Sequence, residues 1–168
     1  MIYDLTVTQF VKVLKNLDHF LDKAQGYADH KKFDVEILMT SRLAPDQFHF
    51  IKQIQIACDA AEAGVKRLMG QNPAASENKE QNLADVRARI KNTISFLQTV
   101  KEADVDNSKN VKISQPRWEG KTMNGYDYII QHMIPNFYFH ITTAYAILRH
   151  NGVDLGKKDY LGDLPYIK

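Results

Sequence analysis

The chain has 168 residues, of which 44% are hydrophobic and 25% charged, and its formal net charge is +2. These values are ordinary for a globular protein, so we expect residues 1–168 to form a single soluble domain with its own core. The small net charge excludes the strong positive field that nucleic acids and anionic membranes select, and we expect neither as a partner. The one cysteine, Cys58, cannot form an internal disulfide, and the N-terminus does not resemble a signal peptide, which together favour a cytoplasmic location.

Three amphipathic helices are predicted in the first part of the chain. The first covers residues 5–29, where apolar residues recur at alternating steps of three and four. The second begins at Pro45, a residue tolerated in a first helical turn, and stops before Gly70, a residue favoured just past a helix end. The third follows a polar loop and ends near Lys101. The expected core stripes are Val7, Val11, Leu14, Leu17, Leu21 and Ala24; Ile51, Ile54, Cys58, Ala61, Val65 and Leu68; and Leu83, Val86, Ile90, Ile94, Leu97 and Val100.

Residues 103–123 break this pattern and predict a long irregular connection with a short extended or hairpin segment. The last helix is predicted over residues 124–150. A proline inside a helix removes a backbone donor, and Pro135 should therefore kink this helix or split it in two. The residues expected to be buried are Tyr126, Ile130 and Met133 before the proline and Phe137, Ile141, Ala144 and Leu148 after it.

Four helices with one apolar stripe each predict an all-α fold, a four-helix bundle, in which the long connection would permit a crossover. Residues 128–148 contain no Asp, Glu, Lys or Arg, and this stretch is near the length of a bilayer span. It also contains polar residues such as Gln131, His132 and Asn136, which are too many for a lipid environment. We therefore interpret it as a buried helix of a soluble protein.

The far side of the last helix also lacks charge, so something must cover it. The connection and the C-terminal tail would do so within one chain, and a second copy of the helix would do so across a two-fold axis. Aromatic residues are favoured at such interfaces. We favour a homodimer with Phe139 and Tyr145 at or beside its interface.

Two parts of the chain resemble an uncharacterised bacterial family, a domain of unknown function. One is the C-terminal run formed by residues 136–152 and 156–162, and the other is the Arg-Leu-Ala-Pro-Asp turn of residues 42–46 with Gln53-Ile-Gln55. That family is similar to the DinB/YfiT-like superfamily of metalloenzymes, which are four-helix bundles and often dimers. The resemblance implies a divalent metal, such as zinc or nickel, held by three histidines. One of these sits on the second helix, and two sit four residues apart on a later helix.

The match to this histidine pattern is incomplete. His140 corresponds to the second histidine of the pair, whereas Asn136 stands at the position of the first and Gln53 near that of the second-helix histidine. His132, Asn136 and His140 are spaced i, i+4, i+8 and would share one face of an unbroken helix. The candidate metal ligands are therefore His140, His132, Asn136 and Gln53. The alternative is that these are polar residues beside the core, hydrogen-bonded inside the bundle.

Other polar residues have simpler interpretations. Gln53, Gln55, Asp59 and Glu62 lie beside the stripe of the second helix, where a solvated face is the commoner arrangement. Arg117 and Trp118 would lie at the mouth of the bundle, as plain packing or as a lid over a ligand.

Two functions remain, and no residue is assigned a catalytic role. The first is a ligand-binding or non-catalytic DinB-like bundle with a degenerate metal site, whose polar pocket around Asn136 and His140 takes an unknown small molecule. The second is a divalent-metal-dependent enzyme, of hydrolase or thiol-group transferase type, in which His140 and His132 hold the ion. The incomplete histidine set favours the first, without a metal cofactor.

Overall fold

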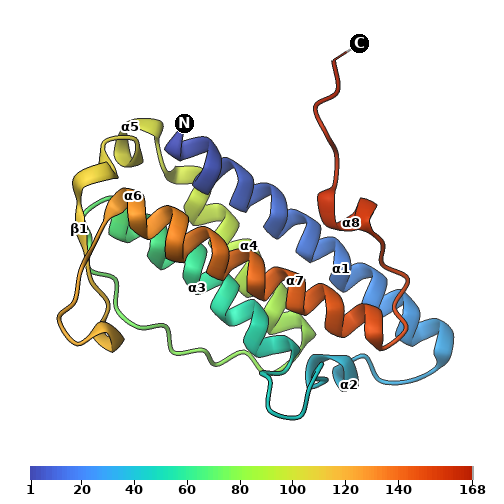
Figure 1. Ribbon diagram of the computed structural model, residues 1–168. Coiled ribbons are helices and arrows are strands. Elements are labelled where there is room, and N and C mark those ends of the chain that lie inside the picture. The colour runs from blue at the N-terminus through green and yellow to red at the C-terminus, as the bar shows by residue number, and fades with distance from the viewer. Residues whose placement is uncertain (168) are drawn as a thin grey trace.

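The computed structural model describes residues 1–167 and is mostly helical (Figure 1). The long helices are α1 (Gln9–Lys31), α3 (Phe50–Leu68), α4 (Leu83–Thr99) and α7 (Ile134–His150). The short ones are α2 (Glu36–Met39), α5 (Glu102–Val105), α6 (Gly125–Tyr128) and α8 (Lys157–Leu161). Two π-helical turns, η1 (Asp4–Thr8) and η4 (Ile129–Met133), precede α1 and α7, and 3-10 turns occupy η2 (Ser108–Asn110) and η3 (Pro116–Trp118). Within residues 1–167, no helix has the length and apolarity needed to cross a lipid bilayer.

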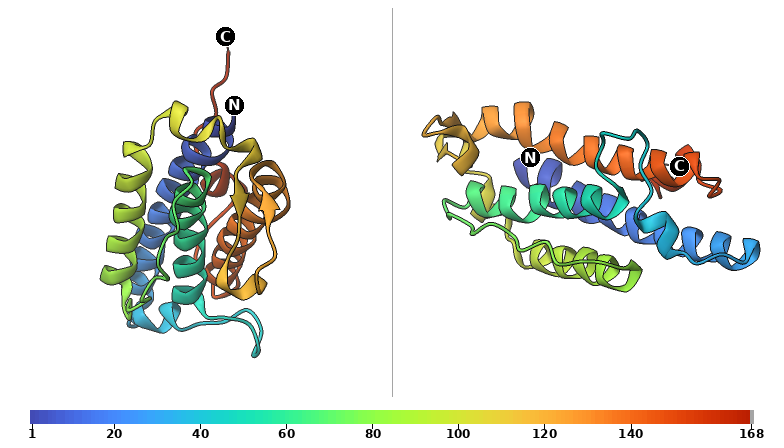
Figure 2. Two further views of the ribbon diagram at one scale, coloured as in Figure 1. Left: turned by 90° about the vertical axis from the view of Figure 1, so that its left-hand side faces the viewer. Right: turned by 90° about the horizontal axis from the view of Figure 1, so that it is seen from below.

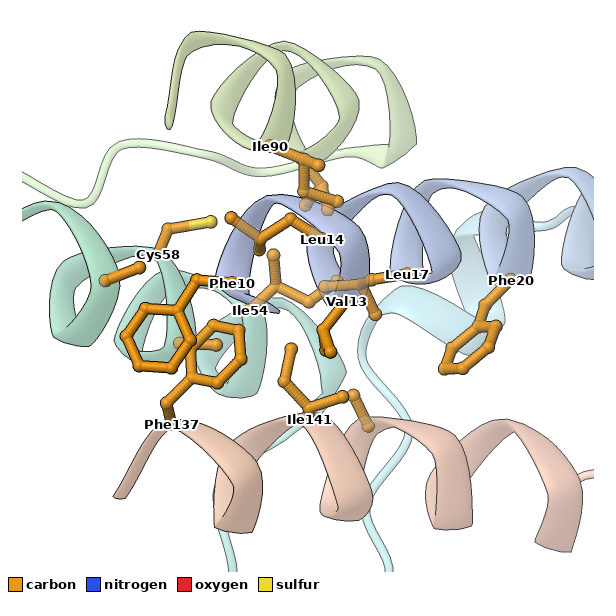
Figure 3. Packing of buried hydrophobic residues seen from close by; sticks show 14 of the residues in the cluster. Phe10, Val13, Leu14, Leu17, Phe20, Ile54, Cys58, Ile90, Phe137 and Ile141 are labelled. Atoms are coloured by element: carbon orange, nitrogen blue, oxygen red, sulfur yellow. The ribbon is translucent and has the colours of Figure 1, made fainter. Parts of the chain in front are cut away.

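The long helices pack side by side around one apolar core (Figure 2). Every residue of the stripe predicted for the second helix is buried, and most residues of the other two stripes are as well. Figure 3 shows Phe10 of α1 beside Phe137 of α7, and their rings stack with centroids 4.0 Å apart. Ile90 reaches the same core from α4 (Figure 3). The predicted terminator Gly70 follows α3 and adopts a φ of 77°, a left-handed conformation that glycine accepts without strain.

The crossover lies between α3 and α4, not in the connection before the last helix. Residues 69–82 run back along α3: Asn78 donates to Asp59 at 3.5 Å, and Gln55, nearer the start of α3, donates to Glu80 at 3.0 Å. Helix α4 therefore begins beside the first half of α3 and runs parallel to it (Figure 1). This returning loop lies over the outer face of α3.

The connection before the last helix forms the predicted hairpin. Strands β1 (Lys112–Ile113) and β2 (Met123–Asn124) pair antiparallel. Gly125 then starts α6 directly against the backbone of η2. A Cβ added at Gly125 would lie 1.9 Å from the carbonyl oxygen of Ser108, so only glycine fits there. This close approach holds the hairpin segment against the first turn of the last helix.

The helix predicted last in the sequence is formed by α6, η4 and α7, and it is called the last helix below. It is irregular before Pro135, but it is not split. Residues 125–150 are helical throughout, and the irregularity is the π turn η4 that ends two residues before the proline. Because a π turn uses one residue more than an α turn, residues before it are displaced by one position relative to an α-helical stripe. The predicted burial of Tyr126 and Ile130 was therefore wrong: they are 53% and 39% exposed, and Gly125 and Ile129 are buried instead.

The C-terminal segment packs mainly on α1 and covers one edge of α7 through Tyr160. The Tyr160 ring packs edge-on against Tyr145 at 5.8 Å, and its hydroxyl hydrogen-bonds that of Thr142 at 2.8 Å. Asn16 of α1 donates to the Tyr160 carbonyl at 3.0 Å and ties the segment down. Phe139 lies outside this cover and is 56% exposed.

Candidate functional site

A cavity of about 460 Å³ lies between α3 and the last helix. On the α3 side, the small side chains of Ala60 and Ala63 line the cavity and leave space for it. The returning loop contributes Ala74 and Ala75 to the lining, and η3 contributes Arg117. Cavities of this size suit small organic molecules.

His140 is the most buried of the candidate ligands that line this cavity, at 7% exposure. Its Nδ1 lies 2.7 Å from Oε1 of Gln53, whose amide nitrogen donates to the carbonyl of Phe48 at 2.8 Å. That second bond orients the amide so that its oxygen faces the imidazole, and His140 Nδ1 is therefore the donor. Burial, with a smaller contribution from Arg117, lowers the pKa of His140 to about 4. His140 is thus neutral, and the lone pair of its Nε2 is available to accept a hydrogen bond.

His132 lines the same cavity from a position nearer the start of the last helix. Its Nε2 lies 2.6 Å from a terminal nitrogen of Arg117, and because a guanidinium only donates, Nε2 is the acceptor and Nδ1 carries the proton. The ring stacks on Tyr128 at 5.4 Å and meets Trp118 edge-on at 5.3 Å. Burial, and then the charges of Arg117 and Arg67, lower the pKa of His132 and keep it neutral.

The structure brings the four predicted site residues together in part. His132, Asn136 and His140 all line the cavity, whereas Gln53 lies behind His140 as its hydrogen-bond partner. Within residues 1–167, no three His, Cys, Asp or Glu side chains are grouped so that they could hold a metal ion.

The prediction of a solvated face on the second helix was wrong for its two glutamines. Gln53 and Gln55 are 1% and 4% exposed, because the last helix covers one and the returning loop the other. Asp59 is paired with Arg89 of α4, which also lies 3.4 Å from Glu80 of the loop. Burial raises the pKa of Asp59, against the opposing charge of Arg89. The negative charge of Asp59 is therefore matched by a partly buried arginine.

The sequence did not single out Arg67, which lines the cavity near the end of α3. Asp59, Ala63 and Arg67 are spaced i, i+4, i+8, and this spacing was the available signal that they share a face. Arg67 lies beside Tyr128, where burial raises the pKa of the phenol while Arg67 and Arg117 oppose that shift. Among the described residues, neither Arg67 nor Arg117 forms an ion pair with a carboxylate.

Comparison with known proteins places this chain in a family. A family model described as a domain of unknown function, DUF1993, matches residues 2–161. This chain belongs to the DUF1993 family. The DUF1993 chain is also similar to a DinB family member from Shewanella denitrificans, solved by crystallography at 1.83 Å resolution. The two share 54% sequence identity over 100% of this chain and 96% of that one, with a TM-score of 0.95. No curated protein matches the chain.

The resemblance inferred from the C-terminal run and the second-helix motif is thus confirmed for the uncharacterised family and for its DinB-like character.

Proposed function

We propose that this DUF1993 protein binds a small polar molecule in the cavity between α3 and the last helix, without a resident metal. The observation that supports this most is the His140–Gln53 hydrogen bond of 2.7 Å. It fixes a neutral imidazole whose remaining nitrogen can accept a hydrogen bond from a ligand. Asn136 adds an amide with both a donor and an acceptor on the same wall.

The residues at hand fit a divalent metal poorly. Arg117 engages Nε2 of His132, and Arg67 adds a second positive charge to the cavity. Gln53 and Asn136 offer neutral amide oxygens where the superfamily pattern has imidazoles, and the Gln53 oxygen already accepts from His140. Zinc and nickel select imidazole, thiolate and carboxylate ligands. The donor set and the charge both favour a ligand other than a cation.

A metal-dependent enzyme of hydrolase or thiol-group transferase type remains the second candidate. One observation favours it: a histidine that donates from Nδ1 to an amide oxygen and keeps Nε2 open has the arrangement usual for a metal ligand. In that case His140, His132 and Asn136 would hold the ion, and the metal would supply a polarised water.

A fragment screen by protein NMR, combined with zinc titration, separates the two candidates. We expect polar fragments to shift the resonances of His140 and Asn136, and to bind the His140→Gln variant at least about fivefold more weakly, since a lost hydrogen bond costs roughly 1–3 kcal/mol. His150→Gln, which changes an exposed histidine at the end of α7, is the matched control. Stoichiometric zinc that survives dialysis in the wild type and disappears in His140→Gln would establish the second candidate instead.

We also propose the larger assembly expected from the sequence. Residues 1–168 would form one domain with its long helices as a four-helix bundle of DinB type, kinked near Pro135, and the protein would be a cytoplasmic homodimer. The exposure of Phe139 supports an interface at that residue. Tyr145 packs against Phe20 and Tyr160 of its own chain, so Phe139 is the better probe of a dimer.

A further inference from the structure

The charges around the cavity are uneven. Asp59 is the acidic residue among its lining side chains, and it is paired with Arg89. Arg67 and Arg117 line the cavity as well, and neither has a carboxylate partner within residues 1–167. His132 and His140 are neutral because burial and the arginines lower their pKa values. One side of the cavity therefore carries a positive charge that nothing in the described chain balances.

Hydrogen-bond donors without acceptors lie on that same side. The Nε–H of Arg67 is buried and has no partner, and the Nδ1–H of His132 is likewise buried without one. Buried donors normally have acceptors, and leaving one unsatisfied costs roughly 1–3 kcal/mol. The other unpartnered polar atom on the lining is an acceptor, Oδ1 of Asn78, and it lies on the Asp59 side. Donors are thus in excess where the arginines are.

We propose that the cavity binds a small organic anion, with its carboxylate or equivalent acidic group between Arg67 and Arg117. This inference rests on the proposed function, because it names the class of ligand for the same cavity. Guanidinium groups pair with carboxylates through parallel charge-assisted hydrogen bonds, which are stronger than neutral ones. The rest of the molecule lies along Ala60 and Ala63, where its donor groups reach Nε2 of His140.

The contact that Arg117 now makes is one that an anion can replace. Arg117 donates to the neutral Nε2 of His132, and a carboxylate oxygen is a stronger acceptor for the same group. Arg117 belongs to the short turn η3, which also carries Trp118, the one tryptophan of the chain. Because Trp118 contacts the rings of His132 and Tyr128, a change at Arg117 alters its surroundings. Tryptophan fluorescence therefore reports on this binding event.

The test uses three acids, butanoate, succinate and benzoate, each beside its uncharged amide. We expect at least one acid to change Trp118 fluorescence saturably, and its amide to bind at least about tenfold more weakly, because the amide lacks the charge that the arginines pair with. Raising the salt concentration should weaken the binding of the acid, because salt screens its attraction to the arginines. If acids and amides bind equally, or if no acid binds, the inference is wrong. Amides that bind as well as acids, and that require His140, would keep the proposed function while removing the anion.

Variants locate the charge. We expect Arg67→Gln and Arg117→Gln each to reduce the affinity for the acid at least about tenfold, measured by isothermal titration calorimetry. This is the loss expected for one charged hydrogen-bond partner. Calorimetry is the measurement for Arg117→Gln because that change itself perturbs Trp118. The matched control is Arg149→Gln, at the far end of α7, which should bind as the wild type does. Equal affinity in Arg117→Gln, with its helical circular dichroism retained, would overturn the proposal.

Discussion

Acid should destabilise this protein through His140, and replacing that residue should remove part of the effect. The folded chain holds His140 neutral with a pKa of about 4, lowered by burial and then by Arg117, whereas an unfolded histidine titrates near 6.5. Between these values the unfolded chain binds a proton that the folded chain refuses. Stability is therefore fully present above the unfolded pKa and is lost as the pH falls toward the folded one.

The size of the effect follows from the two pKa values. A gap of this size corresponds to about 3 kcal/mol when the whole interval has been crossed. At about pH 5 roughly 2 kcal/mol of that is already lost, which is a large share of the stability of an ordinary domain. His132 and His49 act in the same direction, because burial is the leading cause that lowers their pKa values too. A comparison with a variant isolates the part that belongs to His140.

The assay is urea unfolding, followed by circular dichroism, of the wild type and His140→Gln at a series of pH values from about 7.5 down to 5. We expect the difference in unfolding free energy between the two proteins to change by about 2 kcal/mol in favour of the variant as the pH falls. Glutamine at this position retains a polar group for Gln53 but has no proton to gain. Parallel pH profiles for the two proteins would show that His140 is not held neutral by its surroundings.

Three other outcomes follow from the packing. The free energy of unfolding of Gly125→Ala, measured with urea, should be lower by roughly 2 kcal/mol or more, because the added Cβ would meet the Ser108 carbonyl at 1.9 Å. Gly26 lies in α1 with open space around it, so Gly26→Ala should raise the free energy of unfolding by about 0.5–1 kcal/mol. Cys58 is fully buried with its pKa raised by burial to about 12, so a thiol reagent should leave it unmodified until denaturant is added; rapid labelling of the native protein would contradict this. Sedimentation should show a dimer for the wild type and a monomer with retained helicity for Phe139→Asp, and a wild-type monomer at micromolar concentration would rule out the homodimer.

The helices were predictable because each one repeats a local signal. The stripe from Ile51 to Leu68 and the glycine that follows it appear in the structure at the expected places. The start of α3 was not predictable from Pro45, because the chain turns at residues 45–47 and the helix begins only at Phe50. The loop that contains this turn is closed by the Phe50 N–H, which donates to the Ser41 carbonyl at 3.0 Å, and a helical periodicity does not reveal such a bond.

The candidate site was predictable where its residues share one helix. His132, Asn136 and His140 stood out through their spacing, and Asn136 and His140 also through the family resemblance. Arg67 and the Asp59–Arg89 pair did not, because their roles depend on the path of the returning loop and on the docking of α4. The π turn η4 was also invisible to a pattern with a fixed helical period. Long-range packing decides which of many polar residues face the same cavity.

The two walls of the cavity differ in what a substitution there would disturb. The back wall belongs to α3 and the last helix, whose other faces form the core, so changes in it affect folding as well. The front belongs to the returning loop and to η3, where Ala74, Ala75 and Arg117 lie outside the helix packing. Surface segments of this kind tolerate replacement and insertion. Relatives with the same helices can therefore diverge in the molecules they accept, and exchanging these two segments is a direct route to new selectivity on an unchanged scaffold.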